Sequence, residues 1–450
     1  MAEWPLPRPD DLATYIEYLR FRSVSADPGA AGDLRACAQW LVRLMAPWGL
    51  DGRLIETGGA PLVVASTPRT GRPRVLIYGH YDVQPPEPLE AWRSPPFEPA
   101  VEGDLVVARG ATDNKGQTMA VLIGLRRALA AGPLPVDVTV LVEGEEEVGS
   151  PNFGAALARL GDDLAARTLV VADTSMVDAA VPSLTLGLRG ICAVDVRVEG
   201  PAADLHSGTF GGAVANPATV LAGLLAGLHH PDGRVAVPGF YGAVEDVPET
   251  ERAAWRRLPF GDDELLAASG APELAGETGY TALERTWMRP TAEVNGITGG
   301  YDGPGSKTIV PRRASAKLSF RLVPRQDPDH VAELVARDLR ARAPRGVRVE
   351  VDADHGGHPL GVDVDGPSVV CARRAIERVA GAPPALVREG LSIPAMEPLI
   401  RISGAEPLLI GFGRPDCGAH SPNETFPLRH LELGARTVEA LLDELGRSLN

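Results

Sequence analysis

Three consecutive glutamates, Glu145 to Glu147, follow a run of alternating valines in the stretch VDVTVLVEGEEEVGS, residues 136–150. The valines predict a β-strand that ends at Gly144, because β-branched residues are enriched in strands. Adjacent carboxylates at the end of a buried strand repel one another, and bound cations would relieve that repulsion. A solvated acidic loop is the alternative explanation of such a run. Taken alone, the run indicates either a metal site or an exposed turn.

Further acidic and imidazole side chains lie at or just beyond the ends of other predicted strands, or in loops. They are His80, Asp82, Asp113, Asp173 and His420. His80 and Asp82 are two residues apart, so in an extended chain their side chains point the same way. A carboxylate there can accept the N–H of a metal-binding imidazole. The structural alternatives are a turn capped by Asp82 and a helix N-cap at Asp113.

Two imidazoles and several carboxylates without thiolates suit zinc, manganese or cobalt. A carboxylate shared between two ions would give a two-metal site with a spacing of ~3.5–4 Å. Asp113, Glu147 and Asp173 supply three negative charges against four from two divalent ions, and a bridging hydroxide would balance the site. One carboxylate is then left over as a base. Glu146 or Glu147 can be that base, since neighbours in sequence can face different ways.

The elements that must position these residues form an α/β pattern. Apolar runs near residues 75, 105, 138 and 170 predict strands that alternate with helices, which is typical of a mostly parallel sheet flanked by helices. The candidate ligands follow the carboxyl ends of the strands, where open α/β sheets place their ligands. The fold class is therefore predicted as α/β.

A second domain is predicted within the first. Strands are expected at 190–200, 291–298, 314–324 and 346–353, with helices at 215–229 and 329–342, in the order β-α-β-β-α-β of a split βαβ unit. The α/β pattern resumes after residue 358. We therefore expect a catalytic domain made of residues 1–189 and 358–450, and an inserted α+β lid and dimerisation domain at 190–357. Residues 231–290 interrupt the inserted domain, and their pattern assigns them no role.

The composition narrows the class of protein. A net charge of −15 with a pI near 5.1 argues against nucleic acid and anionic membranes as partners. The four cysteines are far apart, with no C-x-x-C pair, so neither a zinc finger nor a disulfide scaffold is indicated. The N-terminal residues lack the pattern of a secretory leader, and no apolar stretch approaches the roughly 18 residues of a membrane span. We therefore expect a soluble cytoplasmic protein.

Five motifs resemble, in order, those of the dinuclear zinc peptidases that include carnosinases, glutamate carboxypeptidases, aminoacylases and acetylornithine deacetylases. They are GHYDVQP, GATDNKG, EGEEEVGS, the aspartate that ends TLVVAD, and CGAHSPNE. DLHSGTFGG and the run GPGSKTIVP…LSFRLVP are similar to the carnosinase-type dipeptidase branch in particular. The resemblance covers essentially the whole chain.

The resemblance implies a role for each candidate residue of the metal site. His80, Asp113 and Asp173 would hold one zinc ion, and Asp113, Glu147 and His420 the other. Glu146 would be the general base, Asp82 would orient His80, and the peptide bond from Asp113 to Asn114 would be cis. Asp173 stands where the carboxypeptidase branch tends to have glutamate, which favours dipeptidase or aminopeptidase-like chemistry.

The resemblance also implies the reaction, which is hydrolysis of the amide bond of dipeptides or short peptides with a free C-terminal carboxylate. His206 would stabilise the oxyanion, Arg321 and Ser392 would bind the terminal carboxylate, and Thr308 and His355 would make further substrate contacts. From the residues alone, Arg321 is an ordinary strand arginine and His355 an ordinary surface histidine.

Two alternatives remain for the function. An N-acyl-amino-acid deacylase would use the same site, whereas a non-catalytic peptide-binding relative would be expected to lack Glu146 or a ligand. Serine-hydrolase, H-E-x-x-H and nucleotide-binding motifs are absent from the sequence. We also expect a homodimer formed through the inserted domain, because its half-exposed sheet and its apolar helix, LAGLLAGL at 221–228, need cover. By the resemblance, His206 would then reach the neighbouring subunit's metals; acting within its own chain is the alternative.

Overall fold

The computed structural model describes residues 4–449 and divides into two units. The first unit contains the chain up to Leu186, then Val362–Val387, and then the chain from Ile393 onward. The second unit contains Gly187–Gly361 and the short segment Arg388–Ser392. The sequence prediction placed the inserted domain at 190–357 and assigned residues 388–392 to the other domain.

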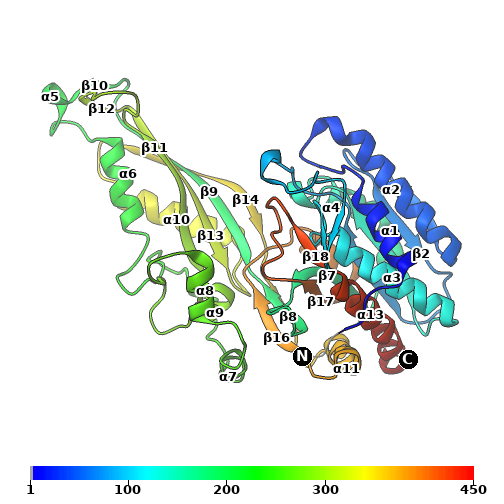
Figure 1. The fold of residues 1–450 in the computed structure, drawn as a ribbon. Helices are drawn as coiled ribbons and strands as arrows, with labels where there is room; N and C mark the ends of the chain where they lie inside the picture. Colours follow the sequence, from blue (N-terminus) through cyan, green and yellow to red (C-terminus); the bar gives the residue numbers. More distant parts are fainter. Residues whose placement is uncertain (1–3, 450) are drawn as a thin grey trace. The chain divides into compact units, whose positions relative to one another are not determined.

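A mixed, mostly parallel sheet forms the centre of the first unit (Figure 1). Its strands run in the order β1-β2-β6-β3-β7-β17-β8, and β6, β3, β7 and β17 are mutually parallel. Every residue of β6 is buried, as expected of a strand covered on both faces. The predicted α/β class is confirmed. The strands are β1 (Asp51–Ile55), β2 (Leu62–Ser66), β3 (Arg74–His80), β6 (Asp137–Glu143), β7 (Thr168–Ser175), β8 (Ser183–Leu188) and β17 (Glu406–Gly413).

Seven α-helices belong to the described part of this unit. Helix α3 packs against α13, which also packs against α11. The backbone approach of α3 to α13 requires a glycine, because a Cβ at Gly124 would lie 2.4 Å from the carbonyl oxygen of Ala435. The helices are α1 (Pro9–Leu19), α2 (Ala31–Met45), α3 (Lys115–Ala131), α4 (Phe153–Leu160), α11 (Pro367–Ala380), α12 (Met396–Ser403) and α13 (Leu428–Leu449).

The strand predicted near residue 105 does not join this sheet, so that part of the predicted strand series is wrong. Strand β5 (Leu105–Val107) lies in a separate sheet, between β4 (Ala100–Glu102) and β18 (Thr425–Pro427). A tight turn at Gly103, with φ of 63°, folds β5 back on β4, and only three residues remain for pairing. The pairing of β5 with β18 connects the segment that precedes Asp113 to the segment that follows His420.

The second unit contains an antiparallel sheet in the order β11-β13-β9-β14. Helices α6 and α10 pack on this sheet through a core that includes Val196, Leu224 and Phe320 (Figure 1). The predicted β-α-β-β-α-β order is present. The elements are β9 (Gly190–Glu199), α6 (Pro217–Ala226), β11 (Thr291–Gly299), β13 (Arg313–Leu322), α10 (Pro328–Arg342) and β14 (Arg348–Gly357).

Residues 231–290 carry a small core of their own, built from Val247, Trp255, Leu283 and Met288. They contribute α7 (Glu249–Trp255), α8 (Asp262–Ser269) and α9 (Ala282–Met288). The remaining short elements of the two units are β10 (Leu205–His206), α5 (Ser207–Phe210), β12 (Ile309–Val310), β15 (Leu360–Gly361) and β16 (Ala385–Glu389).

Two further observations concern the whole described chain. All four cysteines are buried and free of disulfides. Between residues 4 and 449, none of the helices combines the length and the apolar character that crossing a bilayer requires.

Candidate metal centre

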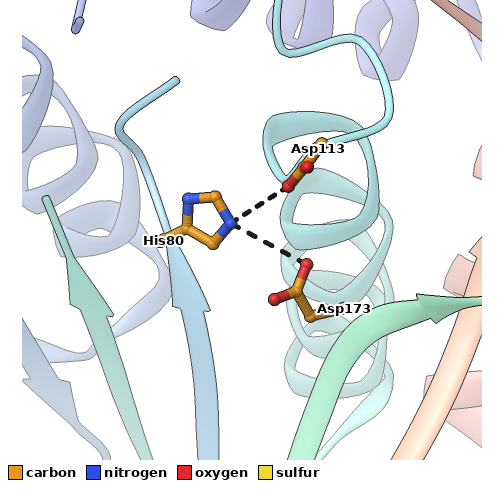
Figure 2. Close-up of side chains that lie close together, drawn as sticks. All are labelled: His80, Asp113 and Asp173. Atoms are coloured by element: carbon orange, nitrogen blue, oxygen red, sulfur yellow. Dashed lines mark ion pairs between the residues drawn. The ribbon is translucent and has the colours of Figure 1, made fainter. Parts of the chain in front are cut away.

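His80, Asp113 and Asp173 come together at the carboxyl ends of the parallel strands (Figure 2). His80 ends β3 and is fully buried, and Asp173 lies near the end of the neighbouring strand β7. The Nε2 atom of His80 lies 3.2 Å from Oδ1 of Asp113 and 3.8 Å from Oδ1 of Asp173. These three potential ligand atoms lie within 4.8 Å of one another, so one cation can contact all of them.

A second group shares Asp113 with the first. The Nε2 atom of His420 lies 2.9 Å from Oδ2 of Asp113 and 3.3 Å from Oε2 of Glu147. Asp113 therefore presents one carboxylate oxygen to each group. A carboxylate in this position can bridge two cations. Both groups lie entirely within the first unit.

The side chains of the three adjacent glutamates point in different directions, because the chain turns through a short 3₁₀ helix at Glu146–Val148. Glu145 accepts hydrogen bonds from Asn152 Nδ2 at 3.1 and 3.0 Å, away from the ligand groups. Glu147 belongs to the second group, and its Oε2 also accepts a hydrogen bond from Gln84 Nε2 at 2.8 Å. The alternative of a solvated acidic loop thus does not describe all three side chains.

The local charge explains why cations would stabilise this site. Burial and, to a smaller extent, the nearby acids Asp173, Glu147 and Asp113 together raise the pKa of Glu146 to about 9, although His80 opposes the rise. Burial also raises the pKa of Asp173. A buried cluster of carboxylates holds protons at neutral pH unless positive charge is supplied. Divalent cations would supply that charge.

Asp82 connects His80 to the glutamate turn. Its Oδ1 lies 3.3 Å from Nδ1 of His80, and its carboxylate accepts hydrogen bonds from the backbone nitrogens of Glu146, at 3.3 Å, and Glu147, at 3.0 Å. The Nε2 atom of His80, on the other side of the ring, is buried without a hydrogen-bond partner among the described residues. An imidazole fixed at Nδ1, with its Nε2 facing carboxylates, suits a metal ligand. The donor set of imidazoles and carboxylates therefore fits a two-metal centre.

The comparisons with known proteins agree with this geometry. The sequence model of peptidase family M20/M25/M40 matches residues 76–444. This chain belongs to that family. It is a metallopeptidase, a hydrolase that acts on peptide bonds, and the resemblance in its sequence motifs is confirmed.

Relatives of the peptidase align over most of its length. A Beta-Ala-His dipeptidase of Rattus norvegicus is 31% identical over 405 residues, which cover 88% of this chain and 82% of the relative. A Cys-Gly metallodipeptidase of Candida albicans is 32% identical over 384 residues, which cover 83% and 79%. Among solved structures, an M20 family metallo-carboxypeptidase of Sulfolobus solfataricus has a TM-score of 0.85 at 31% identity, covering 98% of this chain and 100% of that one. Human carnosine dipeptidase 1 has a TM-score of 0.80 at 27% identity, with coverage of 98% and 100%.

Two residues to which the sequence assigned no role at the site hold the candidate ligand residues in place. Asn114 donates hydrogen bonds from Nδ2 to Oδ1 of Asp173 at 2.6 Å and to the carbonyl oxygen of Ala172 at 2.7 Å. The peptide bond between Asp113 and Asn114 is cis, as the resemblance implied. Glu424 is the other residue, and its side chain is fully buried against the loop before Asp113.

The contacts of Glu424 account for its position. Its Oε1 accepts hydrogen bonds from the backbone nitrogens of Thr112 and Asp113 at 2.7 and 2.9 Å, and its Oε2 accepts from Gly110 N at 2.8 Å and Arg109 Nη1 at 2.9 Å. Burial raises the pKa of Glu424 to about 7, and Arg109 opposes that rise. The only signal in the sequence is that Glu424 ends the CGAHSPNE motif, because a contact across roughly 310 residues leaves no local pattern.

The predicted substrate residues lie in the second unit, in two groups. His206 in β10 is exposed, its Nδ1 accepts a hydrogen bond from Gly208 N at 3.0 Å, and exposed Thr308 precedes the paired strand β12. Arg321 in β13 donates from Nη1 to Oγ of Ser392 at 3.4 Å. His355 lies in β14, and its side chain is outside the described residues.

Proposed function

We propose that this metallopeptidase cleaves dipeptides and short peptides that carry a free C-terminal carboxylate, using two divalent metal ions. The observation that carries the proposal is the division of the two Asp113 oxygens between two ligand groups. His80, Asp113 and Asp173 would hold one ion, and Asp113, Glu147 and His420 the other. Zinc is the metal we propose, and manganese or cobalt would suit the same ligands.

The chemistry of the proposal is general base catalysis at a metal-activated water. When bound, the ions held by these residues would lower the pKa of a water molecule and polarise the scissile carbonyl. Glu146 accepts the proton of the attacking water and then delivers it to the leaving amine. Its half-buried side chain beside the shared ligand Asp113 supports this role. Asp82 keeps His80 in the orientation that faces Asp113.

The substrate would be held by the residues of the second unit. His206 stabilises the oxyanion, and Thr308 and His355 contact the peptide. Arg321 and Ser392 bind the terminal carboxylate, for which a planar guanidinium is well suited. The relatives named as dipeptidases support a short substrate.

We further propose a homodimer formed through the second unit. The helix at 221–228 does not support it as expected, because Leu221, Leu224, Leu225 and Leu228 are buried in the core of their own unit. The support comes from strand β11, which lies at the edge of its sheet and exposes 65% of Ile297 and 41% of Val294. An exposed apolar edge strand is suited to pairing with another chain. The proposed location is the cytoplasm.

A substrate panel tests the function. The metal-loaded protein is given free dipeptides, their C-terminal amides and N-acetyl amino acids, with the Glu146→Gln variant as the inactive control. We expect the free dipeptides to be cleaved fastest. Faster turnover of N-acetyl amino acids would favour the deacylase alternative, and no turnover of any substrate, with metal bound, would contradict the proposal of a catalyst.

A further inference from the structure

Two partly buried arginines of the second unit, Arg189 and Arg321, lack the carboxylate partner that fully buried arginines of this chain have. Elsewhere in the chain, buried guanidinium groups form ion pairs, as Arg289 does with Glu277 at 2.7 Å and Arg109 with Glu424 at 2.9 Å. Among the described residues, neither Arg189 nor Arg321 forms an ion pair, and Nε of Arg189 is buried without a hydrogen-bond partner. Removing a positive charge from water without giving it a partner is costly, and a bound anion would offset that cost.

The two guanidinium groups also repel each other. Burial and, to a smaller extent, the positive charge of Arg321 lower the pKa of Arg189 to about 10, while Glu293 opposes both. Arg189 immediately precedes β9, and Arg321 on β13 is paired with Ile191 of β9, which brings the two side chains to the same end of the sheet. Two like charges held close together disfavour each other's charged form, and a bound anion would offset that repulsion.

Ser392 is hydrogen-bonded to both arginines. Its Oγ donates a hydrogen bond to the carbonyl oxygen of Arg189 at 2.5 Å and accepts one from Nη1 of Arg321 at 3.4 Å. Its loop lies against the guanidinium of Arg189, because a Cβ at Gly390 would be only 2.8 Å from Nη2 of Arg189. A larger residue at position 390 would displace that group.

The loop that carries Ser392 is fixed by the segment to which the sequence assigned no role. Arg388, near the end of β16 and just before this loop, pairs with Glu251 of α7 through two hydrogen bonds of 2.8 and 2.9 Å. Paired forks of this kind are geometrically specific. The helices at 231–290 therefore provide the anchor for Gly390 and Ser392.

We propose that Arg189 joins Arg321, assigned above to the terminal carboxylate, in binding that group of the substrate, and that Arg189 is a specificity-determining residue of the peptidase. A carboxylate has four lone-pair positions and can accept from two guanidinium forks at once. Ser392 positions Arg321 for this contact. The inference rests on the proposed function, because it takes a peptide with a free carboxylate as the substrate.

The kinetic test compares L-alanyl-L-alanine with its C-terminal amide. In Arg189→Met, KM for the free dipeptide should rise on the order of tenfold to a hundredfold, the usual effect of one charge-assisted contact. The preference for the free dipeptide over the amide should fall by the same factor, with a much smaller change in kcat. Arg189→Lys, which keeps the charge, should restore part of the preference. An unchanged preference in Arg189→Met would overturn the inference.

A stability measurement separates this role from a structural one. Arg189→Met should leave the melting temperature unchanged or raise it, because it removes a partly buried charge that has no carboxylate partner among the described residues. The control Arg289→Met should lower the melting temperature, because buried Glu277 loses both hydrogen bonds from Arg289 and keeps, among the described residues, only the longer contacts with Arg234, at 3.8 Å, and Tyr241, at 3.3 Å. A lower melting temperature in Arg189→Met, with the substrate preference intact, would assign the residue to the fold and not to the ligand.

A binding measurement keeps the inference independent of turnover. Calorimetric titration of the metal-loaded Glu146→Gln variant with N-acetyl-L-alanine and with its amide measures recognition of the carboxylate alone. Tighter binding of the acid, lost when Arg189→Met is added, would support the site even if the enzyme cleaved no dipeptide. Equal binding of acid and amide would overturn the inference, whatever the peptidase activity.

Discussion

The carboxylate of Glu424 lies 2.9 Å from the backbone nitrogen of Asp113, the residue whose side chain is shared by the two ligand groups. The same oxygen also accepts from Thr112 N at 2.7 Å. His420, the imidazole of the second group, lies only four residues before Glu424 and has a left-handed φ of 61°. Few residues other than glycine adopt that conformation without cost. Glu424 therefore links the loop of the shared aspartate to the loop of His420.

Replacing Glu424 should weaken metal binding. Glu424→Gln puts a donor amide where four N–H groups now converge, and we expect metal affinity to fall about tenfold to a hundredfold, as for other residues that support metal ligands. Titration of the metal-depleted protein with zinc measures the affinity. Glu406→Gln is the matched control, because Glu406 is hydrogen-bonded to Ser368 and begins β17, at the opposite end of the strand from the site. Equal zinc affinities in both variants would contradict the positioning role.

Metal content is a second prediction. Protein prepared without chelators should contain about two divalent ions per chain, because Asp113 offers one oxygen to each group. Removing the ions should abolish activity and lower the melting temperature, since the carboxylates then repel and the stabilisation by binding is lost. Elemental analysis and thermal unfolding are the measurements. One bound ion or none under saturating zinc would contradict a two-metal centre.

The neighbours Glu146 and Glu147 should give different phenotypes. Glu146→Gln should bind metal normally and lose on the order of 10²–10⁴ in kcat, the scale of a general base. Glu147→Gln should weaken metal binding, because Glu147 belongs to the second ligand group. Glu145→Gln is the control, since Glu145 is hydrogen-bonded to Asn152 away from both groups. Exchanged phenotypes would reverse the two assignments.

Mixed dimers test whether His206 acts across a subunit interface. His206→Ala and Glu146→Ala should each be nearly inactive alone. When the two are refolded together in equal amounts, half of the dimers are mixed and each mixed dimer has one intact site. Activity should then recover to roughly a quarter of wild type, from the two-fold symmetry of the dimer. If His206 acts within its own chain, mixing restores no activity.

Glu143 should make the stability of the metal-depleted protein depend on pH. Burial raises the pKa of Glu143 from 4.5 to about 8, although the hydrogen bond from Tyr78 Oη, at 2.6 Å, opposes the rise. The folded protein therefore keeps a proton that the unfolded chain releases above pH 4.5, so the contribution to stability is full below that pH and is lost as pH rises towards 8. The slope would be about 1.4 kcal/mol per pH unit.

The variant Glu143→Gln removes this titration and keeps an acceptor for Tyr78. Its unfolding free energy, measured by denaturant titration, should therefore increase relative to wild type as the pH rises from 5 to 8. The control is Glu333→Gln on α10, where the side chain is exposed. A difference between Glu143→Gln and wild type that stays constant with pH would show that Glu143 is ionised in the folded protein.

The sequence was sufficient where the signal is local. Alternating valines predict β6, and the spacing of His80 and Asp82 predicts that their side chains point the same way. The order of the motifs indicates a metallopeptidase. These features depend on residues a few positions apart, so they can be predicted from the periodicity of a strand or the length of a turn. The same holds for the β-α-β-β-α-β order of the second unit.

The tertiary structure decided every relationship between distant segments. The sequence could not predict that β5 pairs with β18, because a strand of three residues has no pattern that indicates which strand it pairs with. It left the helix at 221–228 without cover, whereas the folded unit buries those leucines itself. It assigned no role to Glu424 or Arg189. Glu424 accepts hydrogen bonds from a loop about 310 residues away in sequence, and Nε of Arg189 is buried without a hydrogen-bond partner among the described residues. Contacts made by chain folding, and charges left unpaired by it, have no local signature, which is why only the structure revealed them.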